Sequence, residues 1–529
     1  MRMNLLLKLL ITAAFFNALS WIILIPVWQY PDEQAHFAQV QDFAEIGRVP
    51  VVSFDTSSEI ALSEKILGTE RDQFGNNKFV YHPEYKTEYS SNLFGPWEKV
   101  ITNLPKESRQ TFVKKEATQN PPLYYLLGAN TYKLFNSGDL IERVYAIRFL
   151  SLIFFLLTIA IIYKIGQLIF SKSKIAPFVL CILVSFKPMF VFSNTGVIPD
   201  SLTNILFSLM LLFSLKILIS GLKITFIVPI ILTLILGVYT RQQFIASIPV
   251  IAFPVVYHIV KNRKYFLKGI IAFISILIFF IFANTVGTTL LFFNNFRFPE
   301  TTQLNFRPLF SLDFLKYLIQ FVRHFIAETL PWYWGVYKWL SLTIPHINYQ
   351  IINRFILLGL VGVILNLASH LRKRFTKSHL ILVYLIWGTI IYVLIFAVWD
   401  YIFINYSGFS FGFQGRYFFP LIAFHMAILL IGSIHISNII FRKFSKYFLL
   451  FIIFLMISFN NISLAYVASS YYSIDSFSRF VAEVSQYKPI IFKGDIILVI
   501  LFSALILQSL LLFKFAKFLK SQNNYIIEI

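Results

Sequence analysis

Charged residues are scarce in this sequence. Asp, Glu, Lys and Arg together make up 13% of the 529 residues, whereas hydrophobic residues make up 57%. A water-soluble globular domain carries about a quarter charged residues and fewer apolar ones. The mean hydropathy of +0.71 points the same way. The composition therefore excludes a water-soluble globular protein and predicts an all-α, polytopic membrane protein.

Cysteine is almost absent as well. The single thiol, Cys181, can form neither an intramolecular disulfide nor a thiolate metal cluster. The sequence also lacks internal repeats and low-complexity linkers, and it lacks the alternating apolar pattern of outer-membrane strands. We therefore expect one multipass membrane domain over residues 1–529.

Basic residues outnumber acidic ones, with a formal net charge of +21. They gather in short connectors between apolar runs, for example in 261–268, 372–377, 442–446 and 514–520. Basic connectors mark the cytoplasmic ends of membrane helices, so this charge predicts topology rather than a nucleic-acid partner. The distribution of acidic residues supports the same topology, because 16 of the 25 lie in 29–145, a segment that this topology places outside.

Apolar runs long enough to cross about 30 Å of hydrocarbon predict about twelve transmembrane helices. The predicted spans are 9–28, 146–169, 176–197, 201–220, 224–240, 242–260, 267–293, 351–369, 380–400, 417–437, 446–466 and 496–513. Both termini then lie in the cytoplasm, with the protein in the cell membrane. The first run is taken as an uncleaved span rather than a signal peptide.

Two long segments then face the extracytoplasmic side, 29–145 and 294–350, with shorter ones at 401–416 and 467–495. The apolar stretch 122–135 is too short for an ordinary span. We interpret it as an interfacial or re-entrant helix on the outer face, with a short span as the alternative.

The most informative motif follows the first span. From Pro31 to His36 the chain reads Pro-Asp-Glu-Gln-Ala-His, and a short surface helix is predicted from Glu33 to Ile46. A carboxylate at the membrane boundary, tuned by burial and a nearby cation, can act as a general base. The alternative is an ordinary solvated acid at a helix start. One histidine with two acids is too little to indicate a metal site.

A second motif lies at the outer end of a late span, where residues from Gln414 to Tyr417 read Gln-Gly-Arg-Tyr. An arginine there violates the usual sidedness and requires an anionic partner, for which a guanidinium suits a phosphate or carboxylate. Snorkelling or an internal ion pair is the alternative. Outer cations that could support Arg416 include Arg241 and Arg48, and Asp200 could pair with one of them.

Two further patterns mark the outer segments. Consecutive prolines in Asn-Pro-Pro-Leu-Tyr-Tyr, from Asn120 to Tyr125, set the entry of the interfacial helix. The run from Pro331 to Trp339 is rich in aromatic residues. We interpret this run as an aromatic belt at the headgroup level, with a platform for stacking sugars as the alternative.

Together, these motifs resemble the GT-C superfamily of membrane glycosyltransferases. Their order carries the resemblance: the Pro31 to His36 motif, the Asn120 to Tyr125 motif, Pro-Asp-Ser from Pro199 to Ser201, and the Gln414 to Tyr417 motif. Within the superfamily the chain looks most like an uncharacterised family of multipass proteins. Their Phe-Trp-Gly-type motif is echoed in the aromatic run. The resemblance covers roughly residues 1 to 440.

The resemblance implies a transferase that moves a sugar from a polyprenyl-phosphate-linked donor on the extracytoplasmic face, normally with inversion. Its acceptor would be a glycan, a lipid or a protein. By position, Asp32 would be the catalytic base with Glu33 second, and Arg416 would hold the donor phosphate, helped by Arg241. The further site candidates are His36, Arg48, Asn120, Gln414 and Tyr417.

No cofactor is expected. The first outer segment lacks an Asp-x-Asp pair, which disfavours a divalent cation, although Asp32, Glu33 and His36 could still ligate one. The rival interpretation is a transporter or lipid-linked glycan flippase, which would place ionisable residues near mid-membrane. Such residues are few, namely Lys164, Lys187 and Lys216. A catalytically inactive assembly partner with the same fold is a third interpretation.

Overall fold

The computed structural model describes residues 3–47, 55–72, 75–114, 121–262, 266–267, 307–370, 376–440, 442 and 445–521. The predicted span 267–293, beyond its first residue, lies outside this part of the chain. So do two of the predicted site residues, Arg48 and Asn120.

Helices dominate the architecture, as predicted. Nine apolar helices in the described ranges are long enough to cross a membrane, and they correspond to nine of the predicted spans. They are α1 (Met3–Leu24), α6 (Leu140–Ile169), α9 (Asp200–Ser220), η2 (Gln242–Ser247) with α11 (Ile248–Lys261), α15 (His346–His370), α16 (Lys377–Ser407), η6 (Gly415–Leu421) with α17 (Ile422–Ile440), α18 (Ser445–Tyr471) and α20 (Ile496–Lys520).

Two predicted spans form shorter helices instead. The stretch 176–197 divides into α7 (Ala176–Ser185) and α8 (Pro188–Ser193), because Pro188 has no N–H to continue the helix. The stretch 224–240 forms α10 (Ile224–Val238), which is apolar but only 15 residues long. The break after α7 leaves Lys187 at a helix end, where it becomes important for the site.

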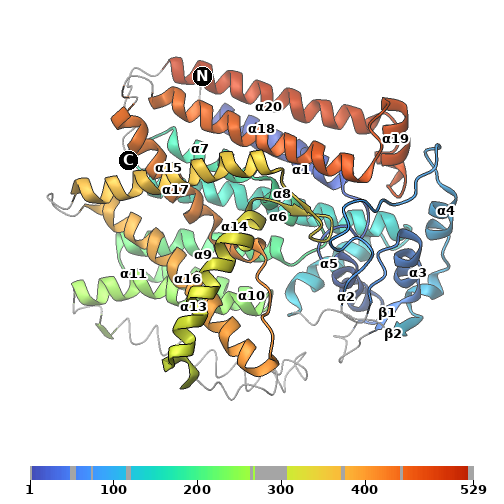
Figure 1. Cartoon of the computed structure of the whole chain (residues 1–529), viewed down its shortest axis with the longest axis horizontal. Coiled ribbons are helices and arrows are strands. Elements are labelled where there is room, and N and C mark those ends of the chain that lie inside the picture. Colours follow the sequence, from blue (N-terminus) through green and yellow to red (C-terminus); the bar gives the residue numbers. More distant parts are fainter. Residues whose placement is uncertain are drawn as a thin grey trace.

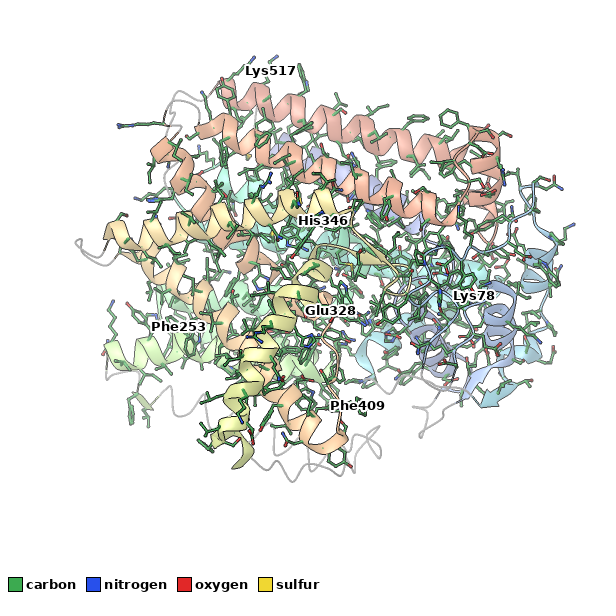
Figure 2. The ribbon with its side chains drawn as sticks, in the orientation of Figure 1. Lys78, Phe253, Glu328, His346, Phe409 and Lys517 are labelled. Atoms are coloured by element: carbon green, nitrogen blue, oxygen red, sulfur yellow. The ribbon has the colours of Figure 1, made fainter. Side chains whose placement is uncertain are left out.

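The first outer segment folds into short elements at one end of the molecule (Figure 1). These are α2 (Glu33–Glu45), β1 (Asp55–Ser57), α3 (Ser58–Leu67), α4 (Pro96–Thr102), η1 (Lys106–Arg109), β2 (Phe112–Lys114) and α5 (Leu123–Leu134). β1 and β2 pair antiparallel, with Thr56 opposite Val113. The helices predicted from Glu33 and around 122–135 are thus both present, as α2 and α5. Lys78 lies at this end, whereas Lys517, near the end of α20, lies at the upper edge of the view (Figure 2).

The second outer segment is described from residue 307 onward. It contains η4 (Arg307–Phe310), α13 (Leu312–His324), η5 (Phe325–Thr329), α14 (Leu330–Trp334), β3 (Val336–Tyr337) and β4 (Leu342–Thr343). Later come α19 (Phe477–Ser485) and η7 (Ile490–Phe492). The β3–β4 hairpin packs onto the bundle, since the Tyr337 ring centroid lies 5.5 Å from that of Trp21 and 5.1 Å from that of Phe192.

The aromatic run is therefore mostly inside the protein. Tyr333, Trp334 and Tyr337 are buried. The interpretation of the run as a belt at the lipid headgroups is wrong for these three rings, because the hairpin folds back onto α1 and α8.

Close helix contacts hold the bundle together. Between α15 and α17, a side chain at Gly432 would overlap the Gly359 carbonyl, so only glycine permits this approach. Between α1 and α18, Asn460 donates to Asn17 at 2.6 Å and accepts from the Trp21 indole at 3.2 Å. In an apolar environment such amide pairs fix the register of helices.

Candidate active site

Asp32 occupies the tight turn between α1 and α2. Its backbone is left-handed, with φ 57°, and its side chain makes no capping hydrogen bond to α2. Left-handed backbone is costly for a residue with a Cβ, so such a residue persists only where its surroundings hold it. Asp32 is therefore not an ordinary acid at a helix start, because its carboxylate does not cap α2.

Two arginines hold that carboxylate. Arg71 Nη2 lies 2.5 Å from Oδ1, and Arg416 Nη2 lies 3.2 Å from Oδ2. The Asp32 side chain remains 34% exposed, whereas Arg416 is buried. Partial burial opposes ionisation, but the charges of Arg71 and Arg416 outweigh it and hold the pKa of Asp32 well below its usual range. Asp32 is therefore a carboxylate at neutral pH.

A second acid extends this network. Asp200, the first residue of α9, pairs with Arg241 through Oδ1, and its Oδ2 lies 3.9 Å from Arg416 Nη1. Three guanidinium groups thus meet two carboxylates, which leaves one formal positive charge. The pairing that the sequence suggested for Asp200 is present.

Arg416 retains unused donors. It is 3% exposed, and neither its Nε nor its Nη1 has a hydrogen-bond partner among the described residues. Buried donors without partners are costly, and a guanidinium offers them in a geometry that suits a phosphate. The Tyr417 ring lies beside both arginines, with its centroid 5.5 Å from Arg416 Cζ and 5.9 Å from Arg241 Cζ.

The segment that carries Arg416 is fixed by close packing. A Cβ at Gly415 would overlap the backbone of Trp332 and Tyr333 in α14. Lys187 contacts both of these segments. Its ammonium donates to the Tyr333 carbonyl of α14 and lies 4.8 Å from the ring centroid of Phe419 in η6. The helix break before α8 thus supports the Arg416 segment.

Glu33 faces a different partner. It is completely buried and forms a bidentate pair with Arg148, at 2.8 Å to Nε and 2.6 Å to Nη2. It also accepts hydrogen bonds from the backbone N–H groups of Trp28 and Val197. Both carboxylate oxygens are therefore occupied in the interior, and no acceptor hydroxyl can reach them without unfolding of this contact.

His36 lies on the buried face of α2. Its Nδ1 is 2.8 Å from the hydroxyl of Tyr125 in α5. Burial, reinforced by Arg241 and Arg416 against the opposing effect of Asp32, lowers the pKa of His36 to about 3. The imidazole is therefore neutral at physiological pH and links α2 to α5.

A cavity of about 180 Å³ opens beside Asp32. Its walls come from the α1–α2 turn, the 75–81 loop, α8, the β3–β4 hairpin and Gln414. Among the described His, Cys, Asp and Glu side chains, no group of three converges as a metal site. The cavity offers one carboxylate, the two amides of Asn76 and Gln414, and several aromatic faces, a mixture suited to a hydroxylated ligand.

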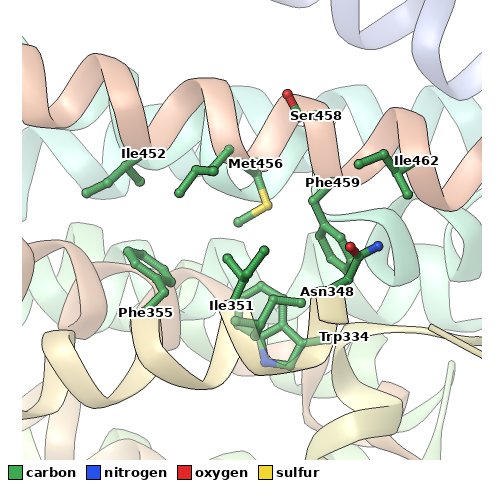
Figure 3. Close-up of a pocket in the computed structure, with 11 residues that line it drawn as sticks. Trp334, Asn348, Ile351, Phe355, Ile452, Met456, Ser458, Phe459 and Ile462 are labelled. Carbon is green, nitrogen blue, oxygen red and sulfur yellow. The ribbon is translucent and has the colours of Figure 1, made fainter. Parts of the chain in front are cut away.

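A second hollow, of about 100 Å³, lies between α15 and α18 (Figure 3). Its lining is apolar and includes Ile351, Phe355, Met456 and Phe459, with Trp334 as its floor. It holds no ionisable group and lies apart from Asp32, so it is not a candidate for chemistry.

Sequence reasoning found much of this site but missed some residues. Asp32, Arg416, Arg241, Gln414 and Tyr417 all gather at neighbouring helix ends, on the side that the sequence predicts to be extracytoplasmic. Arg71 was missed, since nothing distinguishes it from the other charged residues of a polar loop. Arg148 also was missed, although an arginine at the predicted outer end of a span carries the same signal that singled out Arg416.

A model of a protein family described as "Predicted membrane protein (DUF2142)" matches residues 15–425. This chain belongs to that family. The match includes both Asp32 and Arg416. No curated protein matches the chain.

Several solved structures resemble the fold of this chain at low sequence identity. The apo oligosaccharyltransferase of Archaeoglobus fulgidus matches with a TM-score of 0.41 and 14% identity over 88% of this chain, which spans only 56% of that enzyme's length. AglB of the same archaeon, in complex with an inhibitory peptide and a dolichol-phosphate, gives 0.43 and 14% over 88% of this chain and 56% of its own. ArnT of Cupriavidus metallidurans, bound to undecaprenyl phosphate, gives 0.41 and 11% over 92% of this chain and 77% of its own.

Proposed function

We propose that this protein is a membrane glycosyltransferase that moves a sugar from a polyprenyl-phosphate-linked donor to an acceptor on the extracytoplasmic face. One observation carries the proposal. Asp32 and Arg416 are 384 residues apart in the chain, yet their side chains are in contact at 3.2 Å beside an open cavity. A carboxylate able to accept a proton and a guanidinium able to bind a phosphate therefore lie together at the ends of membrane helices. The donor class rests on the motif resemblance to GT-C enzymes.

In the proposed reaction, Arg416 and Arg241 bind the donor phosphate. An acceptor hydroxyl oxygen attacks the anomeric carbon, the bond from that carbon to the phosphate oxygen breaks, and its electron pair leaves with the phosphate. Arg416 neutralises the charge that develops there, and Asp32 takes the proton of the acceptor hydroxyl. Attack opposite the leaving group inverts the anomeric centre.

The ion pairs of the site suggest that the donor binds before the acceptor reacts. Arg71 and Arg416 make Asp32 a weak base in the structure described here. A phosphate that draws Arg416 away from Asp32 would raise the basicity of the carboxylate. Donor binding would therefore activate the base, and the acceptor would react only when the donor is in place.

A transporter or flippase fits these residues less well. Asp32, Asp200, Arg241 and Arg416 all lie at the ends of the membrane helices or just beyond them, rather than in the middle of a span. The charge within the 176–197 stretch, Lys187, is enclosed by rings of Tyr333, Trp334 and Phe419 at 3.7, 4.5 and 4.8 Å from its ammonium. Such an enclosure offers no route for a moving substrate.

The test is transfer of a sugar from a polyprenyl-phosphate-linked donor in membranes that contain the chain. Asp32→Asn removes the base, which typically contributes about 10²–10⁴-fold in rate. Arg416→Ala removes the phosphate ligand, for which we expect a loss of about 10²–10³-fold. Asp475→Asn and Lys316→Ala are controls, because each alters an exposed ion pair, with Arg479 at 2.9 Å and with Asp313 at 3.0 Å.

A further inference from the structure

Unusual backbone conformations cluster in the walls of the cavity beside Asp32. Seven non-glycine residues in the described ranges have left-handed φ values, and five of them line this one cavity. The five are Asp32 (57°), Tyr81 (60°), Lys338 (50°), Trp339 (54°) and Leu340 (64°). Such conformations are costly for L residues and persist where the surrounding structure imposes them, often at binding sites.

The three consecutive residues Lys338 to Leu340 form a left-handed turn that is anchored at both of its polar side chains. The Lys338 ammonium donates to the carbonyls of Pro83 at 2.7 Å and Ser470 at 3.0 Å. The Trp339 indole donates to the carbonyl of Trp28 at 3.1 Å. Three distant segments thus hold this turn in place and one of them fixes the indole, so the turn is a preorganised binding surface rather than a loose loop.

This indole is also joined to the proposed base. The Arg71 guanidinium lies 4.8 Å from the Trp339 ring centroid and pairs with Asp32 at 2.5 Å. A ligand resting on Trp339 is therefore beside the carboxylate. Arg416 and Arg241 do not line the cavity, so the two arginines proposed to bind the donor phosphate lie outside its walls.

The chemistry of the walls identifies the ligand class. Trp339, Tyr81 and Tyr337 supply aromatic surface, whereas Asp32 and Gln414 supply hydrogen-bonding groups. Lys338 is the other charged residue of the lining, and two carbonyls already hold its ammonium. A ring with an apolar C–H face and hydroxyls at its edge matches this arrangement, whereas an anionic ligand would meet Asp32 without a free cation.

We propose that this cavity is the acceptor subsite and binds a neutral pyranose ring, which stacks on Trp339 and presents a hydroxyl to Asp32. The assignment to the acceptor rests on the proposed function, since a general base must contact the acceptor hydroxyl. The binding of a pyranose ring rests on the cavity alone.

The test measures binding of neutral methyl glycosides of glucose, galactose and mannose to the full chain in nanodiscs by saturation-transfer NMR. We expect at least one to bind, with the Kd raised tenfold or more by Trp339→Leu and severalfold by Tyr81→Leu. Trp339→Phe, which keeps an aromatic face, should restore most of the affinity. Trp97→Leu and Tyr85→Leu are controls, because both side chains are exposed and neither lines the cavity.

The outcomes separate this inference from the proposed function. Absence of binding by all three glycosides, or equal affinity in wild type and Trp339→Leu, overturns the pyranose site even if sugar transfer is present. Trp339-dependent binding without any transfer activity supports the pyranose site and refutes the glycosyltransferase. In an active preparation, Trp339→Leu should raise KM for the acceptor and not for the donor. The reverse result overturns the assignment to the acceptor.

Discussion

Asp32 and Glu33 are neighbours in sequence, yet their environments predict opposite consequences of neutralisation. Glu33 is fully buried and accepts four hydrogen bonds, two of them from Arg148. Arg148 is equally buried and also donates to the carbonyls of Ile22, Ile25 and Pro26. The pair therefore ties the end of α1 to α6 and to the start of α2.

Glu33→Gln leaves the Arg148 guanidinium buried without its counter-charge. Breaking one side of a buried ion pair typically costs about 3–5 kcal/mol, which corresponds to a change of about 10²–10⁴-fold in the unfolding equilibrium. Asp32→Asn should cost much less, because its side chain is one-third exposed and its loss leaves Arg416 still close to Asp200. The double variant Glu33→Leu with Arg148→Met should recover much of the loss, since it removes both charges together.

The assay is equilibrium unfolding in mixed micelles of mild detergent and SDS, followed by tryptophan fluorescence. Asp313→Asn is the control, because it removes an exposed pair with Lys316 in which both side chains are about three-quarters exposed. A Glu33→Gln protein whose free energy of unfolding lies within about 1 kcal/mol of wild type would refute the structural role of the buried Glu33–Arg148 pair.

Three further predictions follow from other parts of the molecule. Burial lowers the pKa of His36 to about 3 from its ordinary value of 6.5, so the unfolded chain binds the proton first and the free energy of unfolding should fall as pH drops below about 6.5. His36→Asn should flatten this dependence of the unfolding free energy on pH, and an unchanged dependence would contradict the prediction. Gly415→Ala should displace the Arg416 segment from α14 and lower transfer at least tenfold while the protein stays helical by circular dichroism; normal turnover would show that the contact is dispensable. In a Cys181→Ser background, an impermeant maleimide added outside cells should label Trp97→Cys but not Ser521→Cys, and the opposite pattern would invert the topology.

The outline of the fold could be read from the sequence because membrane spans depend on local composition. In the part of the chain that the structure describes, runs of apolar residues identified nine of its membrane helices, and basic connectors predicted their sidedness. The break at Lys187 was not predicted, because the apolar run continues through Pro188 and predicts a single span over 176–197. Likewise, α10 ends at Val238, earlier than its hydropathy indicates.

The site was predictable only where an unusual residue stood at a helix end. Asp32 and Arg416 are charged at positions where bilayer proteins seldom leave charges unpaired, so both stood out. Arg71 gave no such signal, and its contact with Asp32 depends on a long-range fold. The sequence also could not show that Asp32 faces the cavity while Glu33 is buried against Arg148. A difference of one residue on the turn decides which carboxylate contacts Arg148.

The aromatic run shows the same limit. Its composition fitted both a lipid-facing belt and a sugar-binding surface. Only the fold shows that Tyr333 and Trp334 enclose Lys187 in the interior, whereas Trp339 reaches the cavity. Hydrogen bonds from Lys338 and Trp339 to distant carbonyls decide this arrangement, and no local pattern reveals them.

The central claim is that Asp32 and Arg416 form one catalytic unit at the outer ends of the helices. The most direct test is sugar transfer from a polyprenyl-phosphate-linked donor by wild type, Asp32→Asn, Arg416→Ala and the double variant, with Asp475→Asn and Lys316→Ala as controls. We expect each single variant to lose at least about 10²-fold in turnover, the double variant to lose less than the product of the two, and the controls to match wild type. Full turnover by Asp32→Asn and Arg416→Ala in correctly folded protein would contradict the account.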